Sequence, residues 1–197
     1  MTDPENVKEV LALKPDYLGF IFYPGSKRFL DPLQASWVKE VPGVKKAGVF
    51  VNAGLEEILE ITSALSLDAV QLHGSESPEI CKELKSANFE VIKAIGLNEA
   101  FSWRSLEVYQ DSVDNFLFDT ASAQFGGTGK SFNWELLQKY PLQIPYFLSG
   151  GLDPENLFAA YSVDDHRLFA LDLNSRFEER PGIKNISVLK KALSLII

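Results

Sequence analysis

The stretch TDPENVKEVLALKPDYLGFIF, Thr2–Phe22, places a helix before the first strand and so decides how the elements of this chain are counted. Asp3 followed by Pro4 is typical of a helix start, because aspartate caps the first N–H groups and proline suits the first helical position. Residues 16–22 form a short apolar run, typical of a strand that is buried on both faces. We therefore expect the chain to open with a helix and then a strand.

The same alternation continues along the whole sequence. Six further apolar runs predict strands, at 46–51, 67–72, 89–95, 115–120, 144–150 and 168–174. Helical spacing of apolar residues separates the runs and closes the chain, at 31–41, 55–65, 77–87, 99–109, 133–140, 153–161 and 186–196. Alternation of this kind indicates βα units and a parallel sheet.

The count gives eight helices but only seven strands. A (β/α)8 barrel needs eight of each. We therefore predict one domain over residues 1–197, an α/β TIM barrel lacking its first β-strand in this chain. A doubly wound open sheet is the alternative, because it tolerates other strand numbers, although no Gly-x-Gly-x-x-Gly follows a strand.

Composition limits the kind of partner. The net charge of −8 and the sequence pI near 4.8 argue against a surface for nucleic acid or for an anionic membrane. No apolar run is long enough to span a membrane, and the first residues do not resemble a signal peptide. The single cysteine, Cys81, excludes an internal disulfide and fits a reducing compartment, so we expect a cytoplasmic protein. Cys81 lies between Ile80 and Leu84 on an amphipathic pattern, which favours buried packing.

A glycine-rich segment, FGGTGKSFNW at 125–134, raises the question of a nucleotide-binding P-loop. That motif needs a glycine five positions before Gly129, and this position is Gln124. The pattern therefore disfavours a P-loop. It leaves open an active-site lid or a glycine-rich loop without a catalytic role.

Polar residues gather where the predicted strands end, and barrels of this kind build their active sites there. Asp119 ends the fifth strand and is either a general acid or a residue that closes the loop. His73 follows the third strand and is either structural or functional. Arg28 is either a surface cation or a clamp for a carboxylate.

The last two strands end in a pattern typical of a phosphate site. Gly150 and Gly151 allow backbone N–H groups to approach a ligand, and a helix is expected to start directly afterwards at 153–156. Ser175 and Arg176 follow the next strand. Loops after the final two strands of a barrel commonly bind phosphate, and the alternative is a pair of ordinary βα turns.

Seven motifs, taken together and in order, resemble phosphoribosylanthranilate isomerase along essentially the whole chain. They are LGFIFYPGSKRF, AGVFVN, VQLHGSE, FLFDT, FGGTGKSFNW, LSGGLDPEN and DLNSRFE with the later PGIK. The resemblance implies an Amadori rearrangement of N-(5-phosphoribosyl)anthranilate in tryptophan biosynthesis, without a metal or cofactor.

The resemblance also implies roles for individual residues. Asp119 matches the general acid that opens the ribose ring, and Arg28 matches the residue that holds the anthranilate carboxylate. Further substrate contacts are expected from Gln71, His73 and Asp172. The implied phosphate-binding residues are Gly150, Gly151, Ser175 and Arg176. The implied lid residues are Gly126, Gly127, Thr128, Gly129 and Lys130.

Two departures from the family pattern remain. Arg176 stands where the family often has glycine. The family's first strand, with the approximate pattern Lys-Ile-Cys-Gly and a cysteine that acts as general base, has no counterpart before Met1. We therefore expect a barrel that is strained, gapped or patched by another chain, with impaired turnover, as a monomer or homodimer. The alternatives are a non-catalytic phosphosugar-binding barrel, or a sister enzyme such as indole-glycerol-phosphate synthase that uses Lys93.

Overall fold

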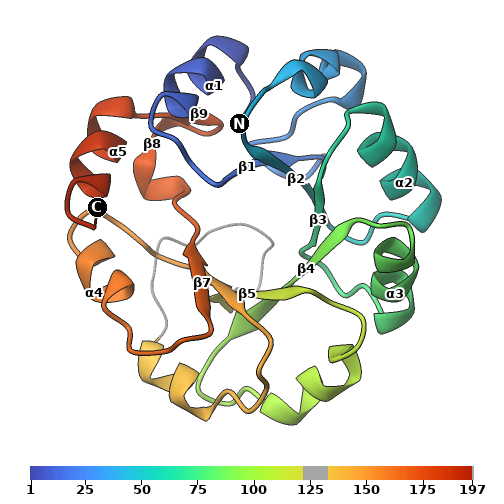
Figure 1. Cartoon of the computed structure of the whole chain (residues 1–197), viewed down its shortest axis with the longest axis vertical. Helices are drawn as coiled ribbons and strands as arrows, with labels where there is room; N and C mark the ends of the chain where they lie inside the picture. Colours follow the sequence, from blue (N-terminus) through green and yellow to red (C-terminus); the bar gives the residue numbers. More distant parts are fainter. Residues whose placement is uncertain (122–132, 197) are drawn as a thin grey trace.

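The computed structural model of the protein describes residues 1–121 and 133–196. Its central sheet has seven strands, each within one of the predicted runs or overlapping it. They are β1 (Tyr17–Ile21), β2 (Lys45–Phe50), β3 (Ala69–Leu72), β4 (Glu90–Leu97), β5 (Asn115–Thr120), β6 (Tyr146–Leu148) and β7 (Leu168–Leu171). Figure 1 shows these strands around a central ring, with the helices on the outside. The prediction of a parallel α/β fold is confirmed.

The seven strands pair in sequence order, and every pair is parallel. A doubly wound sheet reverses its strand order at a switch point, so this order excludes that alternative. The order ends at β1 and β7, and no strand in the described part of the chain joins these two edges. Tyr17 on β1 and Phe169 on β7 nevertheless face each other, with ring centroids 6.2 Å apart. We call the space between these two strands the seam.

The outer layer contains five α-helices among the described residues. They are α1 (Pro4–Leu11), α2 (Leu55–Ala64), α3 (Pro78–Ser86), α4 (Leu157–Tyr161) and α5 (Ile186–Leu193). No helix in the described ranges is long and apolar enough to cross a membrane. Asp3 caps α1 as expected, its carboxylate accepting the N–H of Asn6 at 2.7 Å.

The prediction of eight α-helices was wrong in three places, where the chain forms 3₁₀ turns instead. These are η1 (Pro32–Gln34) with η2 (Ser36–Glu40), then η3 (Trp103–Tyr109) and η4 (Trp134–Lys139). In η3 the sequence WRSLEVY carries aromatic, hydroxyl and β-branched side chains, which lose more freedom in an α-helix than straight chains do. Periodicity located these segments but did not distinguish the tighter 3₁₀ turn from an α-helix.

Two apolar clusters hold the layers together. Mostly small and aliphatic side chains, together with one phenylalanine, fill the inside of the ring, namely Ala47, Ala69, Ile92, Ala94, Leu117 and Phe147. Larger aromatics such as Phe50, Phe116 and Phe118 lie between the strands and the outer layer. Cys81 is fully buried in this outer cluster on α3, which confirms the packing prediction.

A hairpin near the end of the chain was not predicted. Strands β8 (Glu178–Arg180) and β9 (Ile183–Lys184) pair in antiparallel fashion. Asn6 on α1 joins this hairpin to the start of the chain. Its side chain accepts the backbone N–H of Lys184 at 2.7 Å and donates to the Lys184 carbonyl at 3.0 Å. These bonds thus join the start of the chain, at α1, to the hairpin near its end, beside the seam.

Candidate active site

A cavity of about 850 Å³ opens at the carboxyl ends of the strands and extends along the seam. Most of the described candidate residues line it, namely Arg28, Gln71, His73, Asp119, Gly150, Gly151, Asp172 and Ser175. Arg176 does not line the cavity; it lies in the short 3₁₀ turn η5 (Ser175–Phe177). The predicted lid, Gly126–Lys130, lies outside the described residues. Parallel topology explains the gathering, because it brings all the strand ends to one rim.

An acid and an imidazole meet at this rim. Asp119 lies at the end of β5, and His73 directly follows β3. The Nε2 atom of His73 is 3.6 Å from Oδ2 of Asp119, an ion-pair distance rather than a hydrogen bond. The side-chain nitrogen of Gln71 lies 3.0 Å from Nδ1 of the same imidazole. With that amide donating, Nδ1 is the acceptor and Nε2 carries the proton that faces Asp119.

The glycine turn after β6 packs directly against this acid. Gly150 and Gly151 have φ values of +82° and +69°, which strongly favour glycine. A Cβ atom on Gly150 would lie 2.6 Å from the backbone nitrogen of Thr120 and 2.7 Å from Oδ1 of Asp119. The acid and the glycine turn are therefore neighbours on the same rim.

The helix expected directly after this turn begins later than predicted. α4 starts at Leu157, and residues 153–156 form a turn instead. Oδ1 of Asp153 accepts the backbone N–H groups of Glu155 at 2.9 Å and Asn156 at 3.0 Å. Asp153 thus satisfies N–H groups within a turn, as aspartate commonly does, and the helix starts one turn further on. The expectation of helical N–H groups at 153–156 was wrong.

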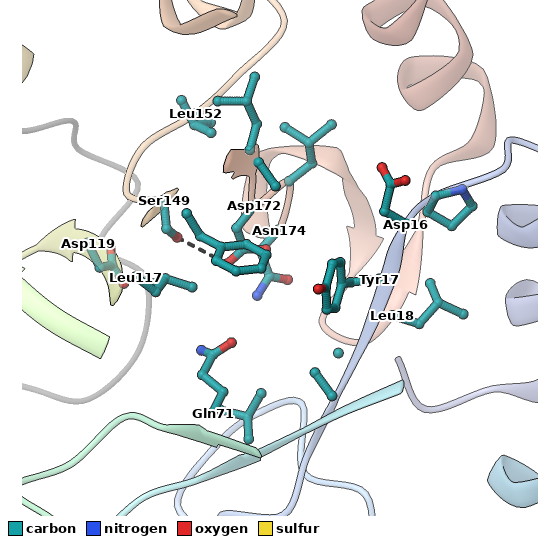
Figure 2. A pocket seen from close by; sticks show the side chains of 18 of the residues that line it. Asp16, Tyr17, Leu18, Gln71, Leu117, Asp119, Ser149, Leu152, Asp172 and Asn174 are labelled. Carbon is teal, nitrogen blue, oxygen red and sulfur yellow. Dashed lines mark hydrogen bonds between the residues drawn. The ribbon is translucent and has the colours of Figure 1, made fainter. Parts of the chain in front are cut away.

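A second carboxyl group lies on the neighbouring strand end. Ser149 donates through its hydroxyl to Oδ2 of Asp172 at 3.1 Å, as the dashed line in Figure 2 shows. Burial raises the pKa of Asp172; the positive charge of Lys184 opposes this rise, and the negative charge of Asp119 adds to it. The rim therefore carries two carboxyl groups with different surroundings.

Sequence reasoning missed two charged residues of the hairpin. Glu178 binds the guanidinium of Arg28 at 2.7 Å, and its side chain is only 4% exposed. Lys184 lines the cavity from β9 and donates to Oδ1 of Asn174 at 2.9 Å. The signal in the sequence was the acid in DLNSRFE and the lysine in PGIK, but neither motif names a partner.

The candidate lysine of the sister-enzyme alternative has a structural partner instead. Lys93 is 2% exposed on β4, and it donates to Glu76 at 3.1 Å and to the carbonyl of Gly74 at 2.8 Å. It does not line the cavity. In the described residues, no group of three or more His, Cys, Asp or Glu side chains is placed to hold a metal ion.

A parallel barrel with charged and glycine-bearing strand ends around one cavity defines an α/β enzyme of the TIM-like class. Comparison with known families narrows this class. Residues 1–194 match the family described as N-(5'phosphoribosyl)anthranilate (PRA) isomerase. The chain belongs to this family, and it is an isomerase of tryptophan biosynthesis.

Curated relatives carry the same name. The N-(5'-phosphoribosyl)anthranilate isomerase of Parabacteroides distasonis is 42% identical over 100% of this chain and 90% of its own length. The enzyme of Phocaeicola vulgatus is 38% identical over 94% of this chain and 89% of its own length.

Solved structures of phosphoribosylanthranilate isomerases are also similar to this chain. The phosphoribosyl anthranilate isomerase of Thermotoga maritima covers 100% of this chain and 95% of its own, with 38% identity and a TM-score of 0.87. A further isomerase structure contains reduced 1-(o-carboxyphenylamino)-1-deoxyribulose 5-phosphate. It covers 100% of this chain and 94% of its own, with 35% identity and a TM-score of 0.84.

Proposed function

We propose that this chain binds N-(5-phosphoribosyl)anthranilate at the cavity rim and catalyses its Amadori rearrangement, with Asp119 as general acid. The observation that carries the proposal is the adjacency of the Asp119 carboxyl, the imidazole of His73 and the glycine turn at Gly150. An acid beside a phosphate-binding turn can act on the sugar that bears the phosphate.

The first step is ring opening. Asp119 gives its proton to the ribose ring oxygen, the bond from that oxygen to C1′ breaks, and the anthranilate nitrogen lone pair forms a C1′=N Schiff base. The backbone at Gly150 and Gly151, with Ser175, holds the phosphate, and Arg176 adds a positive charge nearby. Arg28 holds the anthranilate carboxylate, while Gln71, His73 and Asp172 contact the remainder of the substrate. The lid role predicted for Gly126–Lys130 belongs to this proposal, and that run lies outside the described residues.

The second step needs a base that takes the C2′ proton. The electrons of the C2′–H bond form the C1′=C2′ bond, and the π electrons of C1′=N return to the anthranilate nitrogen. The resulting enol then takes a proton at C1′ and releases its hydroxyl proton to give the ketone. Cys81 does not serve, because its thiol is buried on α3, away from the cavity, and burial raises its pKa to about 11. We propose that the base belongs on a strand paired between β1 and β7, in the seam. In this proposal, residues 1–197 taken alone bind the substrate but turn it over slowly, as a cytoplasmic monomer or homodimer.

Two matched extensions test this proposal. Fusing Lys-Ile-Cys-Gly or Lys-Ile-Ser-Gly before Met1 supplies the same strand with or without a thiol. We expect both extensions to raise the free energy of unfolding, because both pair with the edges of the seam. Only the cysteine form should raise kcat, by about 10²–10⁴-fold.

Three outcomes separate the candidate functions. Equal turnover by both extended forms means that another residue is the base. The unextended chain can also be tested with reduced 1-(o-carboxyphenylamino)-1-deoxyribulose 5-phosphate, here called the reduced analogue. Binding of this compound without turnover of the substrate favours a phosphosugar-binding barrel for the unextended chain. Failure of every form to bind that analogue rejects the proposed substrate.

A further inference from the structure

Glu178 holds one complete edge of the Arg28 guanidinium. Nε of Arg28 donates to both carboxylate oxygens of Glu178, at 3.0 and 2.9 Å, and Nη2 donates to Oε2 at 2.7 Å. The two side chains are 16% and 4% exposed, respectively. Bonds of this forked kind, between two charged groups, fix the plane of the guanidinium as well as its position.

The opposite edge of the guanidinium remains available. A guanidinium has five N–H donors, and the carboxylate of Glu178 takes those on the Nε side. Within the described ranges, Nη1 donates no hydrogen bond, and Arg28 lines the cavity. The outer edge, formed by Nη1 and the second N–H of Nη2, can therefore receive a carboxylate end-on.

The hairpin in turn holds Glu178. The backbone N–H of Gly182, at the turn, donates to Oε1 of Glu178 at 3.2 Å, and Nζ of Lys184 lies 3.5 Å from the same oxygen. Lys184 also donates to the carbonyl of Leu173 at 3.0 Å, just after β7. Glu178 is thus fixed to the same hairpin that holds the strand end before Ser175.

We propose that Glu178 is a positioning residue that presents the outer edge of Arg28 to an aryl carboxylate and so selects substrates bearing that group. This inference rests on the proposed function, because the aryl carboxylate is that of the anthranilate moiety. It adds Glu178 to the site and gives a reason for specificity. Only a ligand that carries both a phosphate and a planar carboxylate can contact the glycine turn and Arg28 at the same time.

A ligand pair separates this role from a general effect on stability. The first ligand is reduced 1-(o-carboxyphenylamino)-1-deoxyribulose 5-phosphate, and the second is its phenylamino counterpart without the carboxylate. Calorimetry gives Kd for both ligands with the unmodified chain, Glu178→Gln, Glu178→Asp and a matched control, Asp165→Asn. Asp165 binds Arg167 in the same forked manner, with Nε to Oδ1 and Nη2 to Oδ2 both at 2.8 Å.

The expected result is a loss of discrimination that is largest in the Gln variant, partial in the Asp variant and absent in the Asp165→Asn control. Glu178→Gln should weaken the carboxylated ligand about 10- to 100-fold, the range expected when charge-assisted hydrogen bonds stop fixing a partner. The ligand without the carboxylate should change by less than about twofold. Glu178→Asp should recover part of the discrimination, since it keeps the charge. Asp165→Asn should lose stability and keep the discrimination.

The opposite results are equally distinct. If Glu178→Gln binds the carboxylated ligand as well as the unmodified chain does, or more tightly, Glu178 does not position Arg28 and the inference is overturned. If the unmodified chain binds neither ligand, the proposed function fails and the inference fails with it. If the Gln variant does not fold, Glu178→Asp decides, with Kd for both ligands and the NMR signal of the Arg28 Nε–H as the measurements. Discrimination equal to that of the unmodified chain, with an unshifted signal, would overturn the role.

Discussion

His73 bridges Gln71 and Asp119, with its Nδ1 atom 3.0 Å from the Gln71 amide nitrogen and its Nε2 atom 3.6 Å from the Asp119 carboxylate. The three residues come from the ends of β3 and β5, which are not neighbours in the sheet. The imidazole thus lies between side chains from two strands that are separated in the sheet by β4.

Replacing the acid tests the first chemical step. Asp119→Asn, made in the form extended with Lys-Ile-Cys-Gly, should lower kcat about 10²–10⁴-fold because the proton donor is lost. Binding of the reduced analogue should persist, since the phosphate and carboxylate contacts remain. Steady-state turnover and calorimetry measure the two quantities. Asp111→Asn, at an exposed site, is the control and should behave as the parent does.

A methyl group on the glycine turn should disturb both stability and binding. Gly150→Ala carries the strain of φ +82° and places Cβ within 2.7 Å of Thr120 and Asp119. Gly43→Ala is the matched control, because it has φ +70° and no atom within 4 Å of the added methyl. Left-handed backbone alone costs about 1–2 kcal/mol. Urea unfolding should show a larger loss for Gly150→Ala, and only this variant should lose phosphate-ligand binding; equal losses would contradict the contact.

Asp172→Asn should stabilise the protein at neutral pH. Burial raises the pKa of Asp172 in the folded protein, so the folded state holds the proton more tightly than the unfolded chain. That contribution to the free energy of unfolding is complete below the unfolded pKa of about 3.9 and is lost as pH rises through the folded pKa. The stability advantage of Asp172→Asn should therefore grow from pH 4 to pH 7 in urea titrations. A constant difference across this range would mean that Asp172 does not titrate abnormally.

Two of the lysine–glutamate pairs, Lys93–Glu76 and Lys45–Glu90, should differ in how much they stabilise the fold. Lys93→Met leaves the buried Glu76 carboxylate without its cation and should cost about 3–5 kcal/mol. Lys45→Met breaks a pair with Glu90 in which the lysine side chain is 54% exposed, and should cost less than about 1 kcal/mol. Chemical denaturation compares them directly. Similar costs for both variants would show that burial does not govern these pairs.

The strands could be predicted from the sequence because parallel strands covered on both faces leave unbroken apolar runs, as FLF and YFL do within β5 and β6. The positions of Asp119, His73 and Gly150 followed from these strand ends. The apolar pattern did not predict that residues 103–109 form a 3₁₀ helix, or that α4 begins only at Leu157, after the turn at Asp153. These depend on local competition between side chain and backbone for the same N–H groups.

The part of the site that sequence reasoning did not predict depends on distance along the chain. Glu178 lies 150 positions from Arg28, and the two come together only because the barrel brings its last elements beside its first. Sequence motifs join residues that are close along the chain. The motif around Arg28 therefore indicated a substrate contact but not its partner Glu178. Cys81, by contrast, was placed by its own amphipathic surroundings, because that information is local.

The join between α1 and β9, where Asn6 meets Lys184 across 178 positions, has a consequence for synthesis on the ribosome. A growing polypeptide carries Asp119 and the glycine turn well before Glu178 and Lys184 are made, so its arginine has no acid to orient it until translation is almost complete. Loop closure over such a span is among the slower events of folding. Under the proposed function, the pair that orients Arg28 toward the aromatic acid is therefore completed only after nearly all of the chain has been made.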